Sequence, residues 1–131
     1  MLNAISIKGQ GATSEVDIYG NLQLQGSFQY NYGGTISATG PLVAPLSQFY
    51  LISNTTAITI TLPVASATTR GTLIQFKRYV SAGGIVTFNQ TGGGFFMVGS
   101  ASLITAASVT MPIATYQTSF ISAGTLWLQH S

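Results

Sequence analysis

Few side chains of this 131-residue chain could take part in acid–base chemistry. Its acidic residues are Glu15 and Asp17, and its single histidine, His130, is the penultimate residue. A general acid and base must both lie within hydrogen-bonding reach of the reacting groups. Glu15 and Asp17 flank Val16 on one side of an expected strand, which is typical of a solvated strand face. The sequence therefore predicts that the chain is not an enzyme and has no catalytic residues.

Metal and cofactor sites are not expected either. The chain has no cysteine, which excludes disulfides and thiolate ligands. One histidine per chain could hold a metal only if symmetry gathered several copies. The glycine-rich run at residues 91–95 lacks the Lys-Ser/Thr pair of a phosphate-binding loop. We expect no metal and no cofactor.

Four side chains remain as candidates for binding a ligand: Arg70, Arg78, Tyr79 and Trp127. Arg78 shares a strand face with Phe76, so its guanidinium must find a partner or reach the rim of the sheet. A sialylated or phosphorylated ligand would suit it, and a solvated edge that carries charges against aggregation is the alternative. Trp127 could stack on a sugar ring, or it could fill a subunit interface or the base of the core.

Composition sets the class of partner. Hydrophobic residues make up 46% of the chain, but charged residues only 5%, against about 25% in typical soluble domains. With so little charge to keep copies apart, we expect a homo-oligomer. Only Lys77 and Arg78 are clustered cations, so nucleic-acid binding is not expected. No apolar run approaches the roughly 18 residues of a transmembrane helix, so membrane insertion is not expected.

The chain is predicted to be all-β, because β-branched residues and glycines dominate and no helical periodicity is seen. Strands about ten residues apart are typical of a sandwich or barrel. We expect an antiparallel, jelly-roll-like β-sandwich. Its strands are predicted at 48–53, 57–62, 72–80, 85–90, 95–98, 107–111, 116–121 and 125–130.

Two hairpins are expected in this sandwich. Residues 81–84 would join the strand of Phe76 to that of Val86, and residues 122–125 would join the strand of Phe120 to the last strand. Glycines in both turns would supply positive φ angles at low cost.

The N-terminal part is organised differently. Short strands with one apolar stripe follow each other from Val16 onward, and such a ribbon is too thin to bury its stripe alone. Three copies around an axis could bury it, and Gly40-Pro41 looks like a hinge into the next unit. We therefore predict a stalk for trimerisation at residues 1–40 and a head domain at 41–131. The predicted oligomer interface comprises Ile18, Leu22, Leu24, Phe28 and, in the head, Phe96, which should face a subunit contact because Phe95 and Phe96 point to opposite faces.

Three segments carry a resemblance to a known class. The stretch from Ile18 to Gly26, with its Gly20-Asn21 turn, is similar to a recurring strand–turn–strand pattern in the stalks of virion fibres. Residues 52–78 resemble the fibre-domain pattern of an apolar strand, a proline-containing connection, a glycine and a strand that ends in a basic residue. The last residues, 120–131, look like the terminal tryptophan strand of the same domains.

The chain thus resembles fibre or capsid-surface heads of phages and large DNA viruses. The resemblance implies a homotrimer on the virion surface, contact with other virion structural proteins, and host attachment through a glycan or protein receptor. It supplies no receptor residue by position. The expected function is that of a structural virion-surface protein, either fibre or minor capsid, whose trimeric head attaches to the host. The alternative is a free carbohydrate-binding module or lectin without a virion role.

Overall fold

A computed structural model describes residues 19–21, 23, 25–27, 31–43, 46–79, 83–94, 96–99, 103–113 and 115–130. These residues contain eleven β-strands and one short 3-10 helix, η1 (Thr91–Gly93). The all-β class is therefore confirmed. The four expected stalk-interface residues, Ile18, Leu22, Leu24 and Phe28, lie outside the described residues. In the described part of the chain, no helix is long and apolar enough to cross a membrane.

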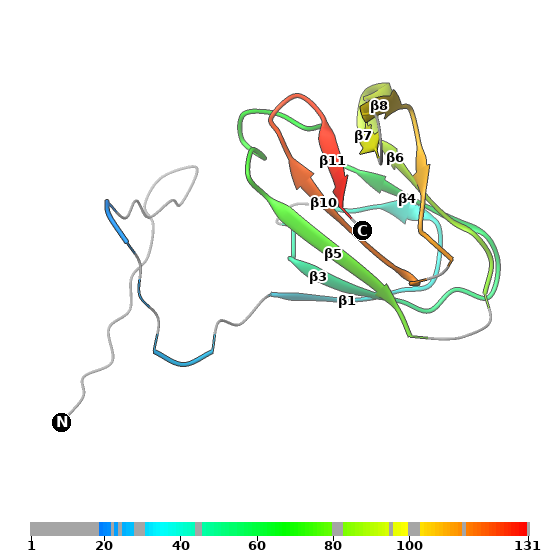
Figure 1. Ribbon diagram of the computed structural model, residues 1–131. Helices are drawn as coiled ribbons and strands as arrows, with labels where there is room; N and C mark the ends of the chain where they lie inside the picture. The colour runs from blue at the N-terminus through cyan, green and yellow to red at the C-terminus, as the bar shows by residue number, and fades with distance from the viewer. Residues whose placement is uncertain are drawn as a thin grey trace.

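The strands form two sheets (Figure 1). The seven-stranded sheet has the order β1 (Tyr32–Ile36), β3 (Phe49–Ile52), β5 (Leu73–Arg78), β10 (Gln117–Ser122), β11 (Trp127–His130), β7 (Phe96–Gly99) and β8 (Leu103–Ala106). The four-stranded sheet has the order β2 (Gly40–Pro41), β4 (Ile58–Leu62), β6 (Val86–Gln90) and β9 (Val109–Thr110).

From β1 to β7 the chain enters the two sheets in turn. Among β1 to β6, strands that neighbour each other in a sheet run in the same direction, so β1–β3–β5 and β2–β4–β6 are two parallel sets. Strand β7 is also parallel to its neighbour β11. Antiparallel pairs join β5 to β10, β10 to β11, β6 to β9 and β7 to β8. Both sheets are thus mixed. The expectation of an antiparallel, jelly-roll-like arrangement is wrong in strand direction, because local alternation says nothing about which strands pair.

One of the two expected hairpins is confirmed. Strands β10 and β11 are antiparallel neighbours. The amide of Ala123 donates to the carbonyl oxygen of Leu126 at 2.9 Å, and Gly124 has a φ of +90°. Only glycine adopts that angle without strain, so the turn is encoded locally.

The other hairpin, at residues 81–84, is wrong. Strand β5 lies in the seven-stranded sheet and β6 in the four-stranded sheet, so the chain between them crosses from one sheet to the other. Gly83 and Gly84 do not have the positive φ of a tight turn. They allow close approach instead, since a Cβ would lie 2.2 Å from the carbonyl oxygen of Asn54 at Gly83 and 2.1 Å from the amide nitrogen of Ala57 at Gly84.

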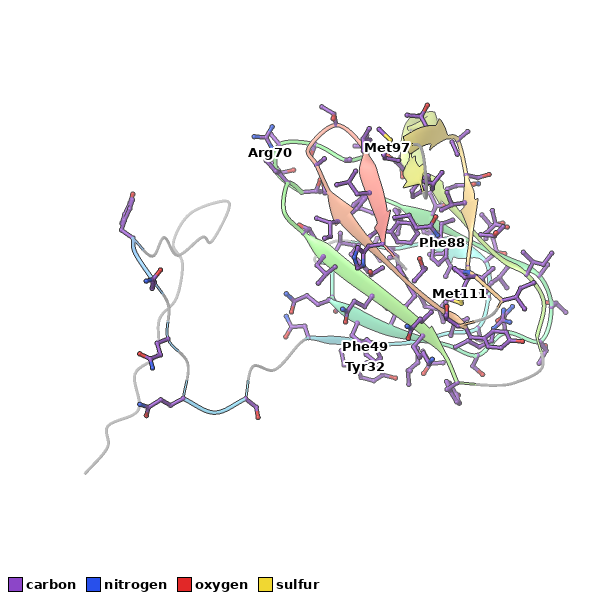
Figure 2. The ribbon with its side chains drawn as sticks, viewed as in Figure 1. Tyr32, Phe49, Arg70, Phe88, Met97 and Met111 are labelled. Carbon is purple, nitrogen blue, oxygen red and sulfur yellow. The ribbon has the colours of Figure 1, made fainter. Side chains whose placement is uncertain are left out.

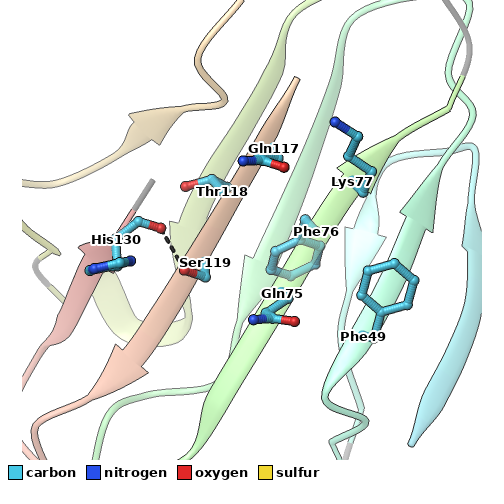
Figure 3. Close-up of a pocket in the computed structure, with 8 residues that line it drawn as sticks. All are labelled: Phe49, Gln75, Phe76, Lys77, Gln117, Thr118, Ser119 and His130. Atoms are coloured by element: carbon cyan, nitrogen blue, oxygen red, sulfur yellow. Dashed lines mark hydrogen bonds between the residues drawn. The ribbon is translucent and has the colours of Figure 1, made fainter. Parts of the chain in front are cut away.

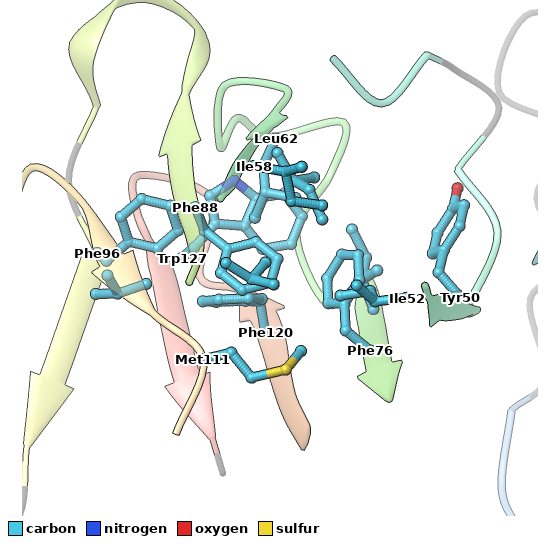
Figure 4. Close-up of a cluster of buried hydrophobic side chains, with 14 of the residues drawn as sticks. Tyr50, Ile52, Ile58, Leu62, Phe76, Phe88, Phe96, Met111, Phe120 and Trp127 are labelled. Atoms are coloured by element: carbon cyan, nitrogen blue, oxygen red, sulfur yellow. The ribbon is translucent and has the colours of Figure 1, made fainter. Parts of the chain in front are cut away.

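The hydrophobic core is built from side chains of both sheets (Figure 4). Every second residue of β4, namely Ile58, Ile60 and Leu62, is at most 4% exposed, as the alternation of this segment predicts. The ring centroids of Phe76 on one sheet and Phe88 on the other are 4.8 Å apart. Side chains from both sheets therefore share one core.

Strand β1 and Gly40 of β2, which the predicted boundary assigns to the stalk, pair with strands of the head. The carbonyl oxygen of Ile36 accepts a hydrogen bond from the amide of Ser53, and the amide of Leu42 donates to Thr61, both at 2.9 Å. Ile36 and Leu42 also pack against the core. The predicted boundary at 40/41 therefore falls within β2. The apolar-stripe argument for a stalk applies only to residues that precede Asn31.

Candidate functional site

The four predicted ligand-binding residues do not form one site. Arg70 is exposed in the turn that precedes β5, whereas Arg78 is the last residue of β5, so they lie at opposite ends of the strand (Figure 2). Tyr79 follows Arg78 and is 59% exposed. The Arg70 guanidinium lies against Gly124, where a Cβ would be 2.8 Å from Nε.

Trp127 is a core residue, so its predicted role in stacking on a sugar is wrong. Its side chain is 0% exposed, and its Nε1 donates to the carbonyl oxygen of Pro63 at 2.9 Å (Figure 4). The ring cannot contact a ligand from this position. Of the alternatives considered for it, the place in the core is the one observed.

Phe96 is also misassigned by the sequence-based prediction. Its ring is 0% exposed and lies 5.4 Å from that of Phe120, between centroids. A side chain so buried within one chain offers no surface to a second subunit. Phe95 and Phe96 were expected to point to opposite faces of a strand. Phe95 lies outside the described residues.

The structure brings other side chains together on the outer face of the seven-stranded sheet, meaning the face turned away from the core. Phe49 pairs with Gln75, Gln75 with Ser119, and Ser119 with His130. Residues directly opposite each other on neighbouring strands point to the same face. Four strands thus contribute one row of side chains.

A second pair continues this face. Lys77 on β5 is opposite Gln117 on β10. Together with the row they surround a hollow of about 370 Å³ (Figure 3), which we call the outer-face hollow. It is lined by Phe49, Gln75, Phe76, Lys77, Gln117, Thr118, Ser119 and His130. Phe76 and Thr118 direct buried side chains to the core, so the other six supply the chemistry.

The outer-face hollow offers hydrogen bonds and one aromatic ring. Lys77 Nζ donates to the carbonyl oxygen of Thr115 at 3.1 Å, and Ser119 Oγ donates to that of His130 at 2.5 Å. The side-chain amides of Gln75 and Gln117 make no hydrogen bond within the described part of the chain, so both can donate and accept.

His130 and Lys77 are the titratable side chains of this lining. Neither Asp nor Glu occurs among the described residues, because Glu15 and Asp17 precede them. No group of three or more potential metal-ligating side chains is found within the same residues. The side chains of the hollow can bind a ligand through hydrogen bonds, a positive charge and an aromatic face.

Sequence reasoning missed this site although part of its signal was visible. Alternation in β5 places Gln75 and Lys77 on the face opposite Phe76. What joins them to Ser119 and His130 is the pairing of β5 with β10, and these strands are far apart in the sequence. That pairing has no local signature.

The chain matches no protein-family model, no curated protein and no solved structure. A functional assignment therefore depends on the fold and on the chemistry of its surfaces.

Proposed function

We propose that the chain is a structural protein of a virion surface, a fibre or minor capsid head, that attaches to a host glycan through the outer-face hollow. In this proposal a stalk in residues 1–30 holds three copies together, and each head is sandwich-like. The observation that carries the binding role is the row of Phe49, Gln75, Ser119 and His130 across four neighbouring strands.

A glycan fits the chemistry of the hollow. Sugar rings present hydroxyl groups that both donate and accept hydrogen bonds, and the amides of Gln75 and Gln117 do the same. Sugars also present C–H faces that lie well against an aromatic ring, which Phe49 provides. Lys77 adds a positive charge for an acidic substituent. A concave site with a few convergent polar groups is the usual form of a small-ligand site.

Removal of the two amides tests this role. We expect the double variant Gln75→Leu/Gln117→Leu to bind the preferred glycan of the wild-type chain roughly 10- to 100-fold more weakly, since each lost hydrogen bond is worth about 0.5–1.5 kcal/mol. A glycan array identifies the ligand, and titration calorimetry measures the affinities.

The matched control is Thr59→Val/Thr61→Val, which removes two polar groups from the outward side of β4 in the other sheet. It should leave the affinity unchanged. If the wild-type chain binds no glycan, or if the two double variants bind equally well, the proposed binding role is wrong.

The trimer is tested by mass. A chain with 5% charged residues and an apolar N-terminal stripe should associate. Light scattering on the full chain is expected to give three times the protomer mass of 13.7 kDa. Deletion of residues 1–30 should give a monomer, because it removes the stripe and leaves the strands of both sheets. A folded, monomeric full chain would rule out the trimer.

The second candidate is a free carbohydrate-binding module with no virion role. The outer-face hollow supports it equally, because its lining residues could bind a glycan without any virion role. A monomer that binds glycan with the dependence on Gln75 and Gln117 described above would select this function.

A further inference from the structure

A second pocket lies on the opposite face of the seven-stranded sheet from the outer-face hollow. It occupies about 200 Å³ between the end of β5, the start of β6 and the segment that follows β9. The side chain of Arg78 forms part of its wall. This pocket is referred to as the Arg78 pocket.

Arg78 is a buried cation. It is 8% exposed, because it lies on the inward side of β5 with Ile74 and Phe76. One terminal nitrogen of its guanidinium donates to the carbonyl oxygen of Gly84, and the ring of Tyr116 lies 5.5 Å from Cζ. Its Nε is buried and has no hydrogen-bond partner. A guanidinium has five N–H donors, so most of this group's hydrogen-bonding capacity is unused by the described residues.

The described residues provide no negative charge for Arg78. Both acidic residues, Glu15 and Asp17, precede the described part of the chain. Buried charges in proteins are almost always paired, since an isolated charge is costly to remove from water. The planar fork of a guanidinium matches a carboxylate with two parallel hydrogen bonds. A carboxylate is therefore the group whose charge and shape this guanidinium matches.

The rest of the pocket wall is largely apolar. Met111 is 6% exposed, whereas Ile113 and Ile85 are 72% and 61% exposed. Large apolar side chains so open to solvent beside a buried cation suit a ligand with a charged end and an apolar body.

We propose that the Arg78 pocket binds a small organic acid, with its carboxylate on the Arg78 guanidinium and its apolar body against Ile113 and Ile85. The same carboxylate chemistry could be supplied by Glu15 or Asp17 of the chain itself, and the experiment separates the two sources. The proposal does not depend on the glycan-binding role.

The test uses benzoate as the probe and benzamide as its uncharged counterpart of nearly the same shape, with the full chain observed by NMR and calorimetry. Benzoate is expected to bind and benzamide to bind at least about tenfold more weakly, because only the anion pairs with the cation. Arg78→Met keeps the apolar stem of the side chain and should lower the affinity for benzoate by a similar factor. Ile113→Trp should also weaken benzoate binding, because the larger side chain would fill the opening of the Arg78 pocket. Ile113 is exposed, so this substitution should not prevent folding.

The variant Glu15→Gln/Asp17→Asn distinguishes an external acid from the chain's own carboxylates. Equal benzoate affinity of the wild-type chain and this variant indicates an external acid. Tighter benzoate binding by the variant, or binding by the variant alone, indicates that the chain's own carboxylate fills the pocket.

Three results would overturn the proposal: benzoate binding to neither protein, benzamide binding as tightly as benzoate, or unchanged benzoate affinity in folded Arg78→Met. Should Arg78→Met fail to fold, unchanged affinity in Ile113→Trp overturns it. Gln75→Leu/Gln117→Leu, which alters the outer-face hollow, should leave benzoate binding intact, so failure of one site is distinguishable from failure of the other.

Discussion

Replacement of Trp127 by alanine is expected to lower the free energy of unfolding by about 3–5 kcal/mol, the usual cost of truncating a large buried aromatic side chain. The side chain is fully buried between the sheets. The substitution leaves a cavity and also removes the donor that the carbonyl oxygen of Pro63 uses. Urea denaturation followed by far-UV circular dichroism measures the loss.

Two further variants serve as comparisons for Trp127→Ala. Leu128→Ala alters the next residue of β11, which points to the outer face and is 38% exposed, so a loss of about 1 kcal/mol or less is expected. Trp127→Phe keeps an aromatic ring but leaves the carbonyl of Pro63 without its indole donor, and an intermediate loss is expected. Equal stability of Trp127→Ala and Leu128→Ala would mean that the indole is not part of the core.

Gly84→Ala is expected to destabilise the fold by about 3 kcal/mol, the upper end of the usual range for overpacking. The new methyl group would lie 2.1 Å from the amide nitrogen of Ala57 and 2.3 Å from the carbonyl carbon of Thr56. These are backbone atoms, which cannot rotate away as a flexible side chain does. A shift of Gly84 would also disturb its carbonyl oxygen, which accepts hydrogen bonds from Asn54 Nδ2 at 2.9 Å and from Arg78.

The control is Gly40→Ala. Gly40 lies in β2, has no atom within 4 Å of a built Cβ, and does not have a positive φ. Alanine there should be neutral or slightly stabilising, since it reduces the entropy of the unfolded chain. Thermal melting of the two variants compares them directly. A Gly84→Ala protein as stable as Gly40→Ala would show that the chain segments at Gly84 are not packed as closely as described.

Local alternation predicted most strands and the direction of their side chains. The run Ile58–Leu62 forms β4 with its three aliphatic side chains inward, and Trp127 is on the opposite side of β11 from Leu128 and His130, as expected. Strand β1 and the first residue of β2 were assigned to the stalk instead, and β8 was not anticipated. The segments of β1 and β2 are short and contain glycine or proline, so their strand character comes from pairing with β3 and β4 rather than from side-chain pattern.

For the candidate sites, too, local alternation predicted side-chain direction but not which segments meet. The inward orientation of Arg78 follows from its spacing to Ile74 and Phe76, and the structure confirms it. The acceptor at Gly84 could not be foreseen, because it depends on a crossing between sheets that was expected to be a hairpin. Arg70 and Arg78 were candidates by residue type alone, and the extended strand β5 holds them apart.

The alternate entry of strands into the two sheets has a consequence for the order of events on the ribosome. As the chain emerges, β3 and β5 can each pair with a strand of the seven-stranded sheet that has already been synthesised, namely β1 and β3. In the four-stranded sheet, β4 and β6 can pair in the same way with β2 and β4. The far side of β5, however, waits for β10, which is synthesised much later. Until then an apolar strand has one row of free amides and carbonyls, which another nascent copy can pair with as readily as the missing strand. The interval between β5 and β10 is therefore when unfinished chains are most exposed to wrong association.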